Sequence, residues 1–229
     1  MRNTKLIVAL DVSTLEAAYD IVERAGDEVQ WYKVGKQLFT RFGPPVIQGL
    51  KDRGKKVFLD MKFHDIPNTV EQAVRSAAAI GADIINVHAF GGPAMLKAAA
   101  KAAEDTGATV IAVTVLTSMD EVELKAVGIS CSPAEQVVRL AKLTHDAGLA
   151  GVVCSAREIQ LIQQNCGREF LTVVPGIRPA GSAVGDQKRV MTPREAALAG
   201  AHFIVCGRPV LKAADPRKAA AAINAEMEL

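Results

Sequence analysis

Residues 79–84 read Ala-Ile-Gly-Ala-Asp-Ile, a stretch that ends one helix-like segment and begins a short apolar run. Similar stretches recur at 146–151 (Asp-Ala-Gly-Leu-Ala-Gly) and at 198–203 (Leu-Ala-Gly-Ala-His-Phe). In all three, the glycine stands where a helix commonly ends in a left-handed residue. The recurrence indicates a degenerate internal repeat, in which one helix-to-strand junction is used many times.

Eight short apolar runs follow this plan, and each leads into a segment with helix signals. They show little alternation of apolar and polar residues, which is typical of strands buried on both faces in a parallel sheet. The predicted strands are residues 6–10, 31–34, 57–59, 84–87, 110–115, 151–153, 171–174 and 203–205. Eight units of about 28 residues predict an α/β fold of the (β/α)8 or TIM-barrel type. A doubly wound open sheet uses the same units and is the main alternative.

Residues that begin helices support this division of the chain. Ser13 or Thr14 can cap the first helix, and Pro133 and Pro193 stand where first turns are predicted. The longer connection between the fifth and sixth strands is predicted to carry an extra short helix within residues 120–127.

Composition narrows the class of protein. The chain has 229 residues, of which 27 are Lys or Arg and 25 are Asp or Glu, so no excess of positive charge points to nucleic acid. No linker interrupts the chain, and residues 1–229 are predicted to form one domain. The sequence has neither a signal peptide nor an apolar run near the ~18 residues of a membrane span. Four widely spaced cysteines indicate reduced thiols, and together these features predict a soluble, cytoplasmic protein without a membrane partner.

Polar side chains gather where the predicted strands end. Active sites of barrels lie at that face, formed by the residues that follow the strands. The residues at these positions are Asp11, Lys33, Asp60, Lys62, His88, Thr117, Ser155, Arg178 and Arg208. Because unpaired buried charge is costly, this set predicts a functional site, with structural ion pairs as the alternative.

The densest cluster is residues 60–69, Asp-Met-Lys-Phe-His-Asp-Ile-Pro-Asn-Thr. In an extended segment Asp60 and Lys62 fall on the same face, and Lys62 then sits between Asp60 and whatever Asp65 can reach. Neighbouring carboxylates keep an ammonium protonated, so Lys62 is predicted to donate a proton rather than to form a Schiff base. Lys33 could complete an alternating array of lysines and aspartates, which suits a reaction that creates a carbanion.

Two features predict a phosphate site. Gly207 and Arg208 follow the eighth strand, where barrels commonly bind phosphate, and Arg178 after the seventh strand could bind the same group. The loop at 176–191 is longer than ordinary connections and is predicted to close as a lid, from which Gln187 could reach an anionic ligand. A surface loop without such a role is the alternative.

The sequence favours a site without metal or cofactor. Asp11, Asp60 and Asp65 could hold Mg²⁺, but Lys33 and Lys62 between them would repel it. No Gly-x-Gly-x-x-Gly follows a predicted strand, so a dinucleotide cofactor has no support.

These motifs resemble the orotidine 5′-monophosphate decarboxylase family over essentially the whole chain. The motif at 60–69 is the most specific, since related barrels share its Asp-x-Lys-x-x-Asp core but not the Ile-Pro-Asn-Thr that follows. The other matching stretches are Val-Ala-Leu-Asp at 8–11, Lys-Val-Gly at 33–35, Val-Leu-Thr-Ser at 115–118, Val-Pro-Gly-Ile-Arg at 174–178 and Gly-Arg-Pro at 207–209.

The resemblance implies a carbon–carbon lyase that converts orotidine 5′-monophosphate to UMP and carbon dioxide in pyrimidine biosynthesis, without a cofactor. It implies that Lys62 protonates C6 of the pyrimidine after carbon dioxide leaves. Asp60 would lie beside the substrate carboxylate and orient Lys62. Asp11 and Lys33 would bind ribose hydroxyls, and Thr117 would contact the pyrimidine edge.

The resemblance also implies a homodimer, in which Asp65 crosses into the partner's site together with Ile66 and Thr69. The residues implied to hold the 5′-phosphate are Arg178, Gln187, Gly207 and Arg208. The main alternative is a Mg²⁺-dependent sugar-phosphate decarboxylase or aldolase of the same barrel superfamily, which carries a metal-binding acid where this chain has Lys33. A catalytically inactive phosphate binder is a third possibility, although the charged array is complete.

Overall fold

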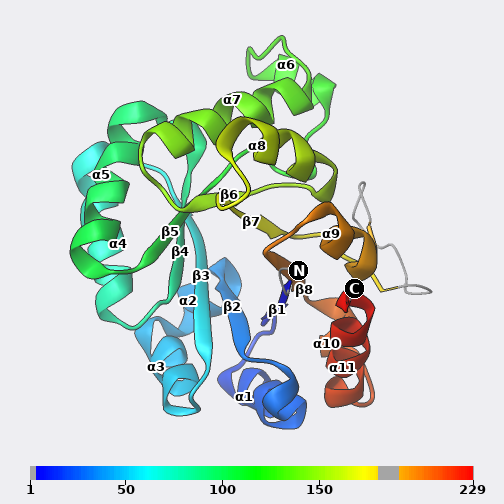
Figure 1. Cartoon of the computed structure of the whole chain (residues 1–229). Helices are drawn as coiled ribbons and strands as arrows, with labels where there is room; N and C mark the ends of the chain where they lie inside the picture. Colours follow the sequence, from blue (N-terminus) through cyan, green and yellow to red (C-terminus); the bar gives the residue numbers. More distant parts are fainter. Residues whose placement is uncertain (1–3, 180–190, 229) are drawn as a thin grey trace.

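The parallel sheet of this protein closes on itself. The structure is a computed structural model, which describes residues 4–179 and 191–228. Across these residues eight strands pair in chain order, and the last pairs in parallel with the first (Figure 1). The strands are β1 Lys5–Ala9, β2 Trp31–Gly35, β3 Lys56–Phe63, β4 Ile84–His88, β5 Thr109–Val113, β6 Gly151–Val153, β7 Leu171–Val174 and β8 Phe203–Cys206. Closure confirms the (β/α)8 barrel and decides against the open sheet.

Helices surround the barrel and fill the connections between strands (Figure 1). They are α1 Leu15–Ala25, α2 Lys36–Phe42, α3 Pro44–Asp52, α4 Pro67–Ala79, α5 Gly92–Thr106, α6 Glu121–Ala126, α7 Pro133–Asp146, α8 Ile159–Cys166, α9 Pro193–Ala199, α10 Arg208–Leu211 and α11 Pro216–Met227. Short 3₁₀ turns lie at Gly26–Glu28, Ala89–Gly91 and Ala156–Glu158. Helix α6 is the predicted extra helix. Of the helices described, none combines the length and the apolar character that crossing a membrane requires.

The predicted helix boundaries have the expected local chemistry. The Thr14 side chain accepts a hydrogen bond from the first turn of α1, and Pro133 and Pro193 are the first residues of α7 and α9. Two of the repeat glycines, Gly81 and Gly200, have φ angles of 95° and 91°. Only glycine adopts such angles without strain, so the recurring junction is a backbone device.

Apolar side chains fill the barrel interior up to the polar residues at the strand ends. They come from alternate positions of the strands, and the Trp31 and Phe203 rings meet edge to face with centroids 5.2 Å apart. Because side chains alternate along a strand, residues two positions further along also point inward. At the mouth of the barrel, where the strands end, the inward-pointing residues are therefore Lys33 after Trp31, Asp60 after Phe58 and Asn86 after Ile84.

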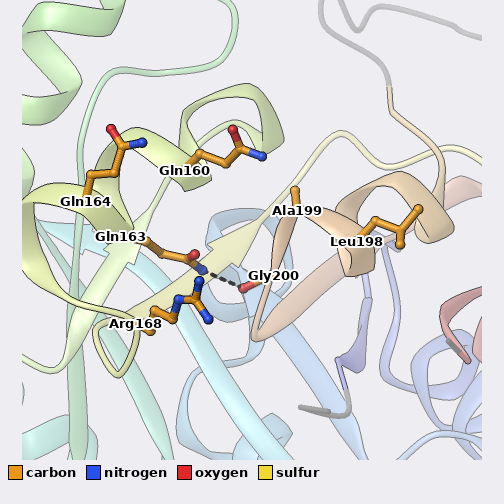
Figure 2. A pocket seen from close by; sticks show the side chains of 7 residues that line it. All are labelled: Gln160, Gln163, Gln164, Arg168, Leu198, Ala199 and Gly200. Carbon is orange, nitrogen blue, oxygen red and sulfur yellow. Dashed lines mark hydrogen bonds between the residues drawn. The ribbon is translucent and has the colours of Figure 1, made fainter.

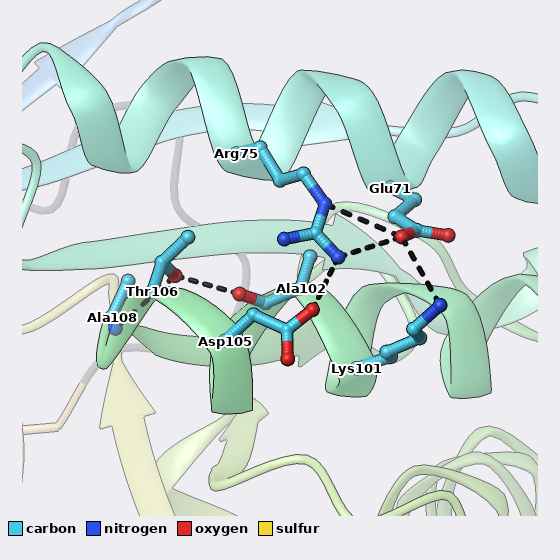
Figure 3. Close-up of polar contacts among 7 residues, drawn as sticks. All are labelled: Glu71, Arg75, Lys101, Ala102, Asp105, Thr106 and Ala108. Atoms are coloured by element: carbon cyan, nitrogen blue, oxygen red, sulfur yellow. Dashed lines mark hydrogen bonds and ion pairs between the residues drawn. The ribbon is translucent and has the colours of Figure 1, made fainter.

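Helices α4 and α5 pack closely side by side, and ion pairs cross their outer surface (Figure 3). Arg75 binds Glu71 on its own helix and Asp105 on α5, while Lys101 lies 3.9 Å from Glu71. Because the Arg75 and Asp105 side chains are partly exposed, solvent screens these pairs and they add little to stability. Helix α4 follows directly after the residue 60–66 segment.

Candidate active site

Two adjoining cavities open at the ends of the strands. The smaller has a volume of about 190 Å³, and its polar lining consists of Lys33, Asp60, Lys62 and Thr117. The larger has a volume of about 470 Å³, and its polar lining includes Asp11, Lys33, Arg178, Arg208 and Lys212. Lys33 lines both cavities, so a single ligand could occupy the two together. Lys212, one helical turn after Arg208, is a lining residue that the sequence had not singled out.

Charged groups of alternating sign connect the first three strands. The Lys33 ammonium lies 3.0 Å from Oδ1 of Asp11 and 3.4 Å from Oδ2 of Asp60. Oδ1 of Asp60 in turn lies 2.6 Å from Nζ of Lys62. A Cβ added to Gly35 would come within 2.8 Å of the Lys33 ammonium, so the glycine leaves room for it. The row in this chain therefore runs Asp11, Lys33, Asp60, Lys62.

The Asp60 side chain is only 14% exposed, and its neighbours determine its ionisation. Burial alone would raise the pKa of Asp60. The charges of Lys33 and Lys62, with hydrogen bonds from Lys62 and Asn86, outweigh burial, and the pKa of Asp60 lies below its ordinary value. Asp60 is therefore a carboxylate at neutral pH, and it lies within ion-pair distance of both lysines.

Strand β3 is irregular where its polar residues begin. Lys62 has a φ of 56°, and pairing with β4 changes register between Leu59 and Phe63. The prediction of an evenly extended segment is therefore wrong, because the strand bulges and the contact between Asp60 and Lys62 forms across the bulge. A left-handed conformation costs a residue with a side chain about 1–2 kcal/mol. Neighbouring groups must hold Lys62 in this conformation.

Asn86 supplies that support, and the sequence reasoning missed it. Its side chain is fully buried on β4. Oδ1 of Asn86 accepts a hydrogen bond from the backbone N–H of Lys62 at 2.8 Å, and Nδ2 donates to Oδ1 of Asp60 at 2.7 Å. The available signal was a single amide inside the apolar run at 84–87, at a position that alternation turns toward the barrel interior.

Three of the four predicted phosphate residues, Arg178, Gly207 and Arg208, line the larger cavity. Arg178 is 7% exposed, and its backbone N–H donates to the Met191 carbonyl at 2.9 Å, which joins the two ends of the predicted lid. Gly207 precedes α10, which begins with Arg208. The predicted residue Gln187 and most of the loop at 176–191 lie outside the described residues.

Three predicted residues stand apart from this row of charges. Ile66 is 66% exposed, and Asp65 and Thr69 are also exposed, around the beginning of α4. Oδ1 of Asp65 accepts a hydrogen bond from the backbone N–H of Ile66 at 2.6 Å. Within the described part of the chain, Asp65 makes no ion pair with Lys62.

His88 ends β4 beside the site, and its ring stacks on that of His64 with centroids 5.5 Å apart. Burial, followed by the positive charges of His64, Lys62 and Lys36, lowers the pKa of His88 to about 4. His88 is therefore neutral at pH 7 and does not compete with Lys62 as a proton donor.

A larger groove of about 760 Å³ lies between α8 and α9 (Figure 2). Gln160, Gln163, Gln164 and Arg168 line it, and Nε2 of Gln163 donates to the Gly200 carbonyl at 3.1 Å. Arg168 and Gly200 precede β7 and β8, so the groove lies away from the strand ends that carry the charged row. The described residues that line this groove include no carboxylate. The acidic and basic side chains that could exchange protons lie instead at the strand ends.

A closed barrel with paired acids and lysines beside an arginine-lined cavity defines an enzyme that acts on a phosphorylated substrate. Residues 4–223 match the family model described as orotidine 5′-phosphate decarboxylase / HUMPS family. The chain belongs to this family.

Individual relatives agree with the family model. The chain is 54% identical over 217 residues to an orotidine 5′-phosphate decarboxylase of Pectobacterium carotovorum subsp. carotovorum, covering 93% of this chain and 88% of the relative. It is 51% identical over 233 residues to the enzyme of that name from Moorella thermoacetica, covering 98% and 92%. A crystal structure of orotidine 5′-phosphate decarboxylase from Lactobacillus acidophilus superposes with a TM-score of 0.88 at 38% identity, covering 99% and 100%.

Proposed function

We propose that this barrel decarboxylates orotidine 5′-monophosphate to UMP and carbon dioxide, as a cofactor-free carbon–carbon lyase of pyrimidine biosynthesis, with Lys62 as its proton donor. Family membership and relatives that carry this name along nearly the whole chain support the reaction. The relatives named above give no support to the alternative of a Mg²⁺-dependent sugar-phosphate decarboxylase or aldolase. We also keep the prediction that the enzyme works in the cytoplasm.

One observation carries the assignment of Lys62. Its ammonium lines the smaller cavity and lies 2.6 Å from the carboxylate of Asp60, with the Lys62 side chain 27% exposed. A cation that is fixed and partly shielded from water stabilises developing negative charge more strongly than a free solvated one. The position therefore suits both stabilisation of a carbanion and its protonation.

The chemistry places two demands on this lysine. Decarboxylation breaks the bond between C6 and its carboxyl group, and the electron pair stays on C6 as carbon dioxide leaves. The Lys62 ammonium stabilises that pair as it develops and then gives C6 a proton. Lys62 is left as a neutral amine and regains a proton from water. Asp60 holds the Lys62 ammonium in place beforehand and lies beside the departing carboxylate.

We assign the remaining lining to the rest of the substrate. Arg178, Gly207 and Arg208 hold the 5′-phosphate in the larger cavity, together with Gln187 from the loop. Asp11 and Lys33, between the two cavities, bind ribose hydroxyls, and Thr117 contacts the pyrimidine. Because the phosphate binds away from C6, its binding energy can be used to close the site.

We further propose a homodimer in which Asp65 reaches the site of a second copy of the chain. Ile66 and Thr69 would accompany it across the interface. The exposure of all three residues supports this arrangement, because a side chain as apolar as Ile66 is 66% exposed beside the mouth in the single chain.

The reaction can be tested directly. The purified protein is mixed with orotidine 5′-monophosphate in excess EDTA, and the ultraviolet absorbance of the orotate ring is followed. We expect the absorbance to fall at the same rate with and without the chelator. Absence of any change, or activity that EDTA removes and Mg²⁺ restores, would contradict the proposal.

A further inference from the structure

We propose that Asn86 is a positioning residue for the proton donor: its amide joins the buried carboxylate of Asp60 to the left-handed backbone of Lys62 and so determines where the Lys62 ammonium lies. The inference rests on the proposed role of Lys62.

Both ends of the Asn86 amide are used. Its oxygen accepts from the Lys62 backbone N–H at 2.8 Å, and its nitrogen donates to Oδ1 of Asp60 at 2.7 Å. The same Asp60 oxygen accepts a hydrogen bond from the Lys62 ammonium at 2.6 Å. Backbone, carboxylate and ammonium are thus tied into one closed set of contacts, centred on a side chain that water does not reach.

The backbone at Lys62 explains why a tie is needed. Lys62 is the single non-glycine residue with positive φ in the described part of the chain. An L-residue is strained in that conformation and leaves it unless other contacts oppose the change. Loss of the Asn86 oxygen would leave a Lys62 N–H without its partner and let the bulge relax, which moves the ammonium.

Only a group that donates and accepts at once can fill this position. Leucine branches at Cγ as asparagine does, but it is bulkier and offers neither contact. An aspartic acid offers both while protonated, since its hydroxyl donates and its carbonyl oxygen accepts. Once ionised it cannot donate, and it faces the carboxylate of Asp60 as a like charge.

The charges that face Asp60 set the expected pH behaviour. They are Lys33 from β2 and Lys62 from β3, with the neutral amide of Asn86 from β4. The hydrogen bond from Asn86 is one of the contacts that hold the pKa of Asp60 down. Its removal raises that pKa and shifts the acid limb of the kcat profile to higher pH.

The test compares Asn86→Leu and Asn86→Asp with a matched control, Thr144→Val, which removes a buried hydrogen bond on α7. Misplacement of a reacting group by about 1 Å costs about 100-fold, so kcat of Asn86→Leu should fall about 100-fold while KM changes less than about threefold. The kcat of Asn86→Asp should rise as pH falls and the introduced acid gains its proton. The control should keep wild-type kcat.

Two results would overturn the inference. One is a kcat for Asn86→Leu within about threefold of the Thr144→Val control. The other, which applies even if Asn86→Leu fails to fold, is a pH profile of Asn86→Asp identical to wild type. Failure of the proposed function is distinguishable, because the wild-type protein would then leave orotidine 5′-monophosphate unchanged or Lys62→Ala would remain active, whereas failure of this inference alone leaves wild type active and Lys62→Ala inactive.

Discussion

Replacement of Lys62 by alanine removes one ammonium that is expected to act twice. A positioned general acid contributes about 10²–10⁴-fold to a rate, and a preorganised group that stabilises developing charge contributes about 10²–10³-fold. The lower bounds multiply to about 10⁴-fold, which is about 5.4 kcal/mol in the activation barrier. Asp60 keeps Lys33 at 3.4 Å and the Asn86 amide at 2.7 Å, so the carboxylate stays paired and the barrel should fold.

Measurements of ligand binding should separate the role of the site in catalysis from its role in binding the nucleotide. UMP lacks the carboxylate that would face Asp60, and its phosphate contacts do not involve Lys62. We therefore expect Lys62→Ala to bind UMP within about threefold of wild type, since uniform binding contacts are retained. Turnover is followed by the loss of orotate absorbance, and UMP affinity by calorimetry.

Backbone conformation adds a second expectation. Alanine at this position keeps the left-handed strain of about 1–2 kcal/mol, whereas glycine relieves it at an entropic cost of about 0.5–1 kcal/mol. Lys62→Gly should therefore unfold at a higher urea concentration than Lys62→Ala. The exposed Lys36 on α2 provides the matched control, and Lys36→Ala should retain wild-type turnover. Activity of Lys62→Ala within tenfold of wild type would refute the reasoning.

The remaining predictions concern assembly and stability. Asp65→Ala and Lys62→Ala chains, each inactive alone, should recover about one quarter of wild-type activity when mixed, because half of the dimers are mixed and each holds one intact site; confirmed mixed dimers without activity would show that each site comes from one subunit. Tyr32→Phe should stabilise the protein by about 1 kcal/mol in urea unfolding, because the buried Tyr32 hydroxyl has no hydrogen-bond partner among the described residues; a lower midpoint would contradict this. The pKa of His88 is low in the folded protein, so the unfolded chain binds more protons between about pH 6.5 and 4. Stability should therefore decrease as the pH is lowered through that range, and it should decrease less in His88→Asn. Equal slopes for both proteins would argue against this.

The barrel could be predicted from sequence because its signals are local. Gly81 and Gly200 end helices through their own backbone angles, and all eight predicted apolar runs overlap strands of the structure. The contacts of Lys33 with Asp11 and Asp60 follow from strand order, since the ends of neighbouring parallel strands meet. These features need no knowledge of side-chain packing.

The parts that sequence reasoning missed depend on packing between strands. The predicted third strand ended at residue 59, whereas β3 continues to Phe63 because a bulge lets Phe63 pair with Val87 on β4. That bulge is supported by Asn86, 24 residues further along the chain. A single amide in an apolar run gives no sign of its partners until the register of the two strands is known.

The pairing of β8 with β1 has a consequence for the order in which activity appears during synthesis. The row from Asp11 to Lys62 leaves the ribosome early, while Arg178 and Arg208 emerge more than a hundred residues later. Only when the last strand docks on the first do the arginines come to lie beside Asp11 and Lys33. A nascent or truncated chain would thus carry the reactive groups without the arginines that hold the phosphate, and activity would arise in one step when the final strand docks.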